Sequence, residues 1–348
     1  RCLTVLLAHE GKVVIKSVIF GCCGFVLKQE EVKFFSSVNP WGFILFKRNI
    51  ENPIQLRALT DSIRDTVGRD IPILIDQEGG RVERLSKPHW RSWMPAMEQM
   101  SLVPEELSDR AMWLRYRIIG EELKKVGIDV NCAPVGDLAN RFTHNVLLNR
   151  CYGRVPNVVI SAARACANGL LDSGVLPVLK HLPGHGRAKV DSHLDLPKIR
   201  ASMDDLSKSD FAVFKGLNDI PLGMTAHVLY EKLDNEFPAT HSKKIIELVR
   251  TELKFNGLLM TDDLSMKALN GTFEDKVKKS LKAGCDLILH CNGNMVEMDE
   301  ISQFCGSLSL ERKKYSDIVL RKRENFSSID VHKLINEYHT IISNIELK

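Results

Sequence analysis

The side chains best suited to chemistry are concentrated in one short segment of the chain, residues 179–196. This segment carries three histidines, two lysines, an arginine and two aspartates around two glycines and one proline. It follows an apolar run, residues 175–179, whose length and composition predict a short buried strand. So many titratable groups on a loop are poor for packing, and this density is typical of a reactive site.

Asp191 and His193 lie two positions apart in this loop, close enough for the carboxylate to orient the imidazole. Such a pair fixes the histidine tautomer and stabilises the imidazolium, which suits proton transfer near neutral pH. The same residues could instead have a structural role, with Asp191 capping backbone amides and His193 in solvent. Their spacing alone leaves both interpretations open.

A metal-dependent hydrolase is an alternative use of the same loop, with His181, His185 and His193 as ligands. However, the proline and glycines between His181 and His185 disfavour the helix that would bring these two side chains together. The loop also lacks an H-x-H or H-E-x-x-H pattern. The sequence therefore favours a site without a metal, and no cofactor is predicted.

Two further groups of charged residues follow apolar runs. Asp262 and Asp263 end one run, where they could be a nucleophile and its support or a helix N-cap. Asp76 and Arg84 flank Gly79 and Gly80, and a turn there would aim a carboxylate and a guanidinium at one polar ligand. Alternatively, Asp76 and Arg84 could form a surface ion pair that contributes little to stability. No glycine-rich or Walker-type nucleotide motif is present.

Eight short apolar runs alternate with helical patterns to position these residues. The predicted strands are residues 17–21, 41–46, 71–75, 128–132, 175–179, 221–225, 258–261 and 286–290. Helices are predicted from Asn52 to Gly68 and over residues 105–126 and 161–173, and others start at Ser202, Ser242 and Thr272. Further helices close the chain, with basic residues expected on a solvated face, namely Arg312, Lys313, Arg321, Lys322 and Arg323.

This alternation predicts an α/β protein with a parallel sheet, and the polar residues indicate how the sheet closes. The polar clusters all lie just after a strand, and in a (β/α)8 barrel every such position faces the end that carries the active site. An open sheet would unite only the loops near its switch point. We therefore expect a single (β/α)8 TIM-type barrel over residues 17–348, with C-terminal helices, and a poorly ordered N-terminal extension over residues 1–16.

Composition narrows the possible partners and compartment. The chain has 348 residues, of which 44% are hydrophobic, and a formal net charge of +4, which gives no reason to expect a nucleic acid partner. Nine cysteines at irregular spacing favour reduced thiols and a cytoplasmic location. No apolar stretch approaches the roughly 20 residues that span a bilayer, so no membrane association is expected. We expect a monomer.

The chain as a whole resembles glycoside hydrolase family 3, and in particular its bacterial β-N-acetylhexosaminidases. The resemblance runs from about residue 18 to 292 and rests on motifs in a fixed order. The motifs are Gly42-Phe43-Ile44-Leu45-Phe46, Asp76-Gln77-Glu78-Gly79-Gly80-Arg81-Val82, Lys180-His181-Leu182-Pro183-Gly184-His185-Gly186, Asp191-Ser192-His193, Thr261-Asp262-Asp263-Leu264-Ser265-Met266 and Ala283-Gly284-Cys285-Asp286.

The resemblance implies a retaining exo-β-N-acetylglucosaminidase that cleaves its substrate in two steps. Asp262 would be the nucleophile and form a covalent glycosyl-enzyme, while His193, polarised by Asp191, would act first as acid and then as base. The substrate would be a small carbohydrate, N-acetylglucosamine in peptidoglycan muropeptides that are recycled in the cytoplasm. The implied sugar-binding residues are Asp76, Arg84, Arg150, Lys180 and His181.

The sequence departs from the family pattern around Arg150. Leu148 and Asn149 stand where a glycine and an acidic residue are usual, and Val155 replaces an aspartate. A relative that binds the sugar without cleaving it is therefore a third hypothesis, beside the hydrolase and the metal enzyme.

Overall fold

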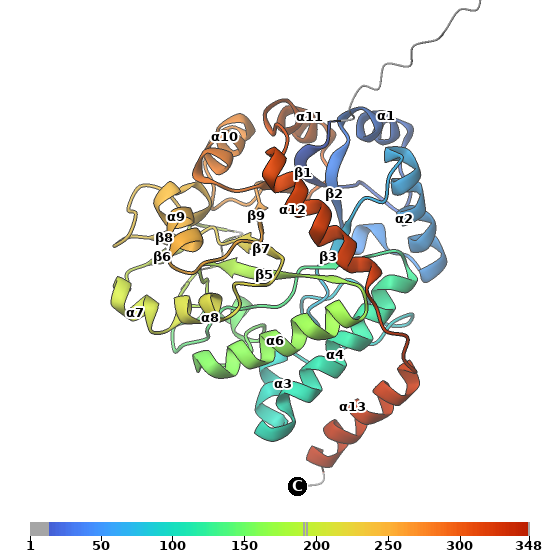
Figure 1. Cartoon of the computed structure of the whole chain (residues 1–348), viewed down its shortest axis with the longest axis vertical. Coiled ribbons are helices and arrows are strands. Elements are labelled where there is room, and N and C mark those ends of the chain that lie inside the picture. Colours follow the sequence, from blue (N-terminus) through green and yellow to red (C-terminus); the bar gives the residue numbers. More distant parts are fainter. Residues whose placement is uncertain (1–13, 191, 193, 347–348) are drawn as a thin grey trace, which may run out of the picture.

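The protein folds as a closed barrel of eight parallel strands, seen from one end in Figure 1. The computed structural model describes residues 14–190, 192 and 194–346. The barrel strands are β1 (Lys16–Gly21), β2 (Pro40–Leu45), β3 (Ile73–Ile75), β4 (Val130–Asn131), β5 (Leu176–Leu182), β7 (Leu222–Thr225), β9 (Leu258–Asp263) and β10 (Leu287–His290). Each strand pairs with the next barrel strand along the chain, and β10 closes the barrel on β1, with Val18 opposite Ile288. The predicted (β/α)8 barrel is confirmed.

The strands are continuously apolar because both of their faces are buried. In β2, Phe43 and Leu45 pack in the large cluster between the sheet and the helices, whereas Ile44 lies between them in sequence and packs inside the barrel. Successive side chains of a strand point to opposite faces, so such a strand needs hydrophobic residues at every position. The interior cluster also contains Leu74 and Met260.

Helices surround the barrel, and the cap signals in the sequence locate several of them. Asn52 caps α2 (Pro53–Val67), accepting a hydrogen bond from the Gln55 amide at 2.9 Å, and Gly68 ends it in the left-handed conformation. The other predicted helices form as α4 (Glu105–Lys125), α6 (Pro156–Asp172), α7 (Met203–Ser207), α9 (Lys243–Thr251) and α10 (Phe273–Ala283).

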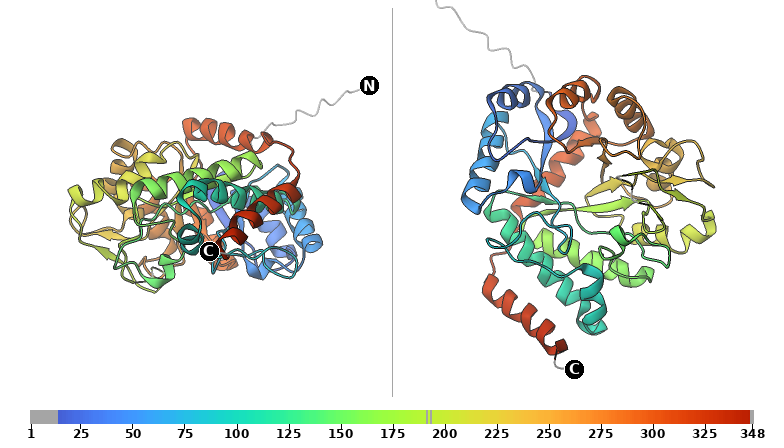
Figure 2. Two further views of the ribbon diagram at one scale, coloured as in Figure 1. Left: turned by 90° about the horizontal axis from the view of Figure 1, so that it is seen from below. Right: turned by 180° about the vertical axis from the view of Figure 1, so that it is seen from behind.

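Several elements were not predicted individually. They are the helices α1 (Gln29–Val38), α3 (Ala96–Leu102), α5 (Asn145–Leu148), α8 (Asp210–Gly216), α11 (Met295–Phe304), α12 (Leu310–Arg321) and α13 (Val331–Glu346), and the two-stranded sheet of β6 (Lys198–Ile199) and β8 (Leu229–Tyr230). Figure 2 shows α13 lying against the outside of the barrel, where Tyr338 packs edge-on against Trp93 at 5.1 Å between ring centroids.

Helix α12 covers the amino-terminal end of the barrel. Figure 1 shows it crossing in front of the strands, and Trp41 Nε1 of β2 donates a buried hydrogen bond of 2.8 Å to Ser316 Oγ of α12. The prediction that the basic residues of this region all face solvent was wrong for Arg323, which is buried against Asp129 at 2.5 Å. Arg312 is also half-buried and pairs with Asp286 at 2.8 Å.

Of the predicted N-terminal extension, residues 1–16, only the last three lie among the described residues. Residues 1–13 lie outside the described residues, while Lys16 is the first residue of β1 and pairs with Pro40. Within the described part of the chain, none of the helices is long and apolar enough to cross a membrane.

Candidate active site

A cavity of about 160 Å³ opens at the carboxyl ends of the strands. Six of the eight predicted site residues line it, namely Asp76, Arg84, Arg150, Lys180, His181 and Asp262. The other two, Asp191 and His193, lie outside the described residues, although Ser192 between them lines the same cavity. The fold therefore gathers at one place side chains that come from four different strand ends and their loops.

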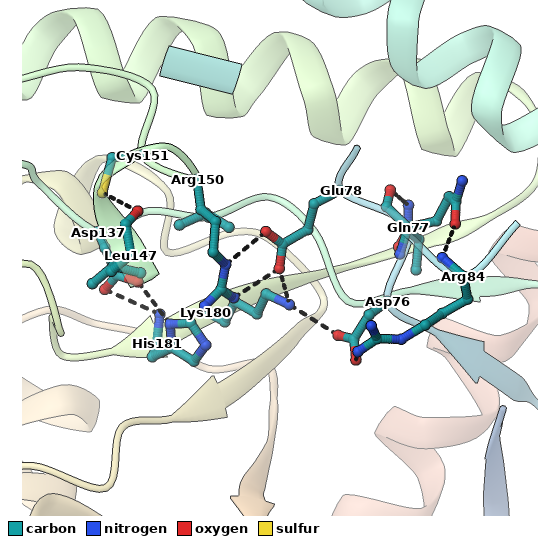
Figure 3. Close-up of polar contacts among 12 residues, drawn as sticks. Asp76, Gln77, Glu78, Arg84, Asp137, Leu147, Arg150, Cys151, Lys180 and His181 are labelled. Atoms are coloured by element: carbon teal, nitrogen blue, oxygen red, sulfur yellow. Dashed lines mark hydrogen bonds and ion pairs between the residues drawn. The ribbon is translucent and has the colours of Figure 1, made fainter. Parts of the chain in front are cut away.

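An alternating cluster of charges forms one side of this cavity (Figure 3). Lys180 Nζ lies 3.0 Å from Asp76 Oδ1 and 2.6 Å from Glu78 Oε1, and its side chain is only 2% exposed. Arg84 contacts the other oxygen of Asp76 at 3.0 Å. Arg150 binds Glu78 through two hydrogen bonds, of 2.9 and 2.8 Å. We call these five residues the charge cluster.

Ion pairing keeps the charge cluster ionised despite its burial. Desolvation by itself would raise the pKa of Asp76, but the cations of Lys180 and Arg84 outweigh it and hold that pKa well below its usual range. Burial likewise opposes ionisation of Glu78, yet Arg150 and Lys180 lower its pKa to about 2. The same carboxylates raise the pKa of Lys180 above its ordinary value, although burial acts in the opposite direction.

The charge cluster has the chemistry of a sugar-binding surface. It consists of three cations and two carboxylates, held in fixed positions by mutual contacts. Sugar hydroxyls both donate and accept hydrogen bonds, and bonds to ionised partners are shorter and stronger than neutral ones. Because the protein has already fixed these side chains, a polyhydroxylated ligand loses little binding energy in ordering them.

His181 is oriented by Asp137, which the sequence analysis did not single out. Its Nδ1 lies 2.6 Å from Asp137 Oδ2, and the other carboxylate oxygen accepts the His185 amide at 2.7 Å. Burial opposes ionisation of Asp137, but His181 lowers the Asp137 pKa to about 2. An ionised carboxylate can only accept, so the proton of this contact is on His181 Nδ1.

The strand β9 ends in two aspartates with different surroundings. Asp262 lines the cavity, and its Oδ1 accepts the Asp263 amide at 2.8 Å. The Asp263 carboxylate instead accepts the amides of Ser265 at 3.1 Å and Cys291 at 3.2 Å. The next helix, α10, is capped by Thr272, so the aspartates do not form a helix N-cap. Both aspartates line the cavity, and Asp263 in addition holds the surrounding backbone through these two amides.

His227, after β7, supports the same strand end. Its Nε2 lies 3.1 Å from the Asp263 carbonyl oxygen, which can only accept, so Nε2 carries the proton. Burial lowers the pKa of His227, and the neutral ring therefore accepts at Nδ1 from the Thr240 hydroxyl at 2.7 Å.

Sequence reasoning missed two carboxylates that the site depends on, Glu78 and Asp137. Both follow barrel strands, β3 and β4, as the predicted residues do. Their position after a strand was the available signal, and Glu78 even belongs to a motif that had been recognised. As for the metal alternative, the described residues include no group of three or more histidine, cysteine or acidic side chains arranged to hold an ion.

Comparison with known proteins agrees with this architecture. Residues 15–322 match the glycosyl hydrolase family 3 N-terminal domain. A beta-hexosaminidase of Glaesserella parasuis is 30% identical over 340 residues, covering 94% of this chain and 96% of that protein. A beta-hexosaminidase of Alkalilimnicola ehrlichii is 36% identical over 283 residues, covering 79% and 80%.

A solved structure extends the likeness to the fold. NagZ from Neisseria gonorrhoeae, in complex with N-trifluoroacetyl-D-glucosamine, superposes with a TM-score of 0.79 at 28% identity, covering 95% of this chain and 97% of that one. The barrel and its matches define the protein as a glycoside hydrolase. More particularly, the chain belongs to glycosyl hydrolase family 3, as the motifs predicted.

Proposed function

We propose that this enzyme is a retaining exo-β-N-acetylglucosaminidase. The observation that carries the proposal is the presence of Asp262 in the same cavity as the charge cluster. A terminal sugar bound by its hydroxyls to the cluster would present its anomeric carbon to a carboxylate at the end of β9. The names of the two relatives, both beta-hexosaminidases, and the aminosugar bound to the solved NagZ support the same substrate class.

The proposed reaction has two displacements. Asp262 attacks the anomeric carbon as the bond to the leaving oxygen breaks, and His193 gives that oxygen its proton. A covalent glycosyl-Asp262 results. His193 then takes a proton from water, which attacks the same carbon and releases Asp262, while Asp191 stabilises the imidazolium. An imidazole carries its proton near neutral pH without the desolvation that a carboxylic acid would need.

We infer that the terminal N-acetylglucosamine belongs to muropeptide fragments of peptidoglycan, recycled in the cytoplasm by a monomeric enzyme. The nine cysteines support that location, because they are irregularly spaced and the eight within the described residues are all free thiols.

Turnover of a simple substrate tests the core of the proposal. With 4-nitrophenyl N-acetyl-β-glucosaminide in the presence of a chelator, we expect release of nitrophenol with the sugar first freed as the β-anomer. Asp262→Asn should lower kcat by roughly 10³-fold or more, because it removes the nucleophile. The matched control, Asp61→Asn on the exposed face of α2, should retain full activity.

Two results would contradict the proposal. Well-folded protein with no turnover would leave only a sugar-binding role, and activity that is lost on chelation and restored by zinc would favour the metal-dependent alternative.

A further inference from the structure

Two arginines of α4, Arg115 and Arg117, are completely buried, each with 0% exposure. Arginine is rarely buried to this extent unless a carboxylate pairs with it. Arg117 follows this rule, because it forms an ion pair with Glu121 of the same helix. Arg115 differs, since within the described residues its three hydrogen bonds all go to uncharged oxygens, at 2.6 to 2.9 Å. Burying a cation in this way is costly, which makes the position of Arg115 informative.

The Arg115 guanidinium holds the backbone of the segment that supplies part of the charge cluster. Its Nη2 donates to the Glu78 carbonyl oxygen at 2.6 Å, and its Nη1 donates to the Met94 carbonyl oxygen at 2.9 Å. The guanidinium also lies directly against Gly79, where a Cβ atom would meet Nη2 at 2.1 Å. Gly79 has a φ of +96°, which residues with a side chain rarely adopt. Arg115 therefore fills the space that the missing side chain of this glycine leaves.

The next residue of α4, Tyr116, holds the same carbonyl group. Its buried hydroxyl donates to the Glu78 carbonyl oxygen at 3.2 Å and lies 3.0 Å from the hydroxyl of Tyr152. Tyr152 is two residues beyond Arg150, the arginine that the Glu78 carboxylate binds. Helix α4 thereby connects the backbone of Glu78 with the segment that carries Arg150.

Glu78 passes this arrangement on to the charge cluster. Its carboxylate accepts two hydrogen bonds from Arg150, at 2.9 and 2.8 Å, and lies 2.6 Å from Lys180 Nζ (Figure 3). A shift of the Glu78 backbone would therefore change the positions of both cations. Misplacing a binding group by about 1 Å can cost on the order of 100-fold in rate, so the anchoring of this backbone has consequences for the site.

We propose that Arg115 is a positioning residue for sugar binding. By fixing the Glu78 carbonyl group, it sets the place from which the Glu78 carboxylate holds Arg150 and Lys180. The inference rests on the proposed function, because the charge cluster has to bind the terminal sugar for Arg115 to matter. It deepens that function by adding a residue that lies behind the cavity, outside its lining, and sets the affinity for the sugar.

Arg115→Met and Arg117→Met form a matched pair of variants. Each replaces one fully buried arginine of α4 by an apolar residue of similar length, so both should lower the melting temperature. With 4-nitrophenyl N-acetyl-β-glucosaminide, Arg115→Met should raise KM about 5- to 20-fold and leave kcat within about twofold, because the sugar loses contacts that it makes both before and during the reaction. Arg117 binds Glu121 and the Ser327 carbonyl oxygen instead, so Arg117→Met should leave KM within about twofold.

The two kinetic constants separate positioning from stability. A purely structural defect lowers the fraction of folded enzyme, which lowers the apparent kcat and leaves KM unchanged. N-acetylglucosamine, used as a competitive inhibitor, reports binding directly, and its inhibition constant should rise in Arg115→Met by the same factor as KM. Two milder variants decide the question if Arg115→Met does not fold. Arg115→Lys keeps the charge but loses the fork of donors, and Tyr116→Phe removes only one hydroxyl, so each should raise KM about 2- to 5-fold.

An unchanged KM in folded Arg115→Met, or an equal rise of KM in Arg117→Met, would overturn the positioning role. Unchanged KM values in both Arg115→Lys and Tyr116→Phe would do the same. Failure of the proposed function looks different, because it appears in the unmodified protein, which would then not cleave the glycoside. If that protein still binds N-acetylglucosamine, equal affinity in Arg115→Met refutes the inference, and if it does not bind the sugar, the inference falls with the proposed function.

Discussion

Glu78→Gln removes one negative charge from the charge cluster while keeping the shape of the side chain. Glu78 is 3% exposed and accepts three contacts from cations, two from Arg150 at 2.9 and 2.8 Å and one from Lys180 at 2.6 Å. In the variant only Asp76 would balance the charges of Lys180, Arg84 and Arg150.

The magnitude follows from burial. Removing one partner of a buried ion pair costs about 3–5 kcal/mol, because the remaining charge stays desolvated. We therefore expect Glu78→Gln to lower the free energy of unfolding by about 3 kcal/mol. The surface pair Arg57–Asp61 has a similar geometry, 2.9 Å, but its side chains are 52% and 48% exposed, so Asp61→Asn should cost only about 0.5 kcal/mol.

Chemical denaturation of Glu78→Gln, Arg150→Met, the double variant Glu78→Gln/Arg150→Met and the surface variant Asp61→Asn measures these differences. The double variant should lose less than the sum of its parts, by roughly 2 kcal/mol or more, because it removes both members of one pair. Glu78→Gln should also lower kcat/KM, since Arg150 and Lys180 lose the partner that sets their positions. Two results would refute the view that Glu78 holds the Arg150 side chain in position. One is a loss of less than about 1 kcal/mol in the free energy of unfolding of Glu78→Gln, and the other is a double variant whose loss equals the sum of the two single losses.

Two further predictions concern pH and packing. Burial lowers the pKa of His185 to about 4, so the unfolded chain binds a proton that the folded one does not as pH falls from about 6.5 to 4. This histidine should therefore lower the free energy of unfolding by up to about 3 kcal/mol as the pH falls through that window. His185→Gln should make the unfolding midpoint depend less steeply on pH, and an unchanged pH dependence would contradict this prediction. Gly169 of α6 lies so close to α4 that a Cβ would meet the Trp113 carbonyl oxygen at 2.6 Å, so Gly169→Ala should destabilise the protein by about 1–3 kcal/mol in thermal unfolding. Gly24→Ala, with no atom within 4 Å of its Cβ, is the matched control, and equal melting temperatures would refute the packing argument.

The barrel was predictable because its strands are buried on both faces. A run such as Phe43-Ile44-Leu45 has to be apolar at every position, and eight runs of this kind are hard to mistake for another fold. Helix starts were also predictable where a side chain caps the backbone, as Asn52, Ser242 and Thr272 do.

Helix α1 was missed because its start lacks the usual signal. Its N-cap is Lys28, and the cap is supplied from inside the helix by Glu31, whose carboxylate accepts the Lys28 amide at 3.0 Å. In α6 the β-branched stretch Val158-Val159-Ile160 resembles a strand, so the predicted start at Ser161 was five residues late.

The site was predictable where a motif or a strand end marked it, and not where the partner is distant in sequence. The sequence around Arg150 departs from the family pattern. No neighbouring residue indicated that Glu78, 72 positions earlier, binds this arginine. In the same way Asp137 meets His181 only because the barrel places the ends of β4 and β5 side by side. Contacts between loops depend on how the closed sheet arranges the strand ends. A single sequence does not show which residues of different loops will meet.

Trapping the covalent intermediate tests the central claim most directly. A slow N-acetyl-β-glucosaminide analogue with a fluorine at C5, across the ring oxygen from the anomeric carbon, should accumulate the glycosyl-enzyme, and peptide mass spectrometry should find the sugar on Asp262. A label on another residue, or steady turnover of unlabelled protein with direct inversion of the sugar, would contradict the account.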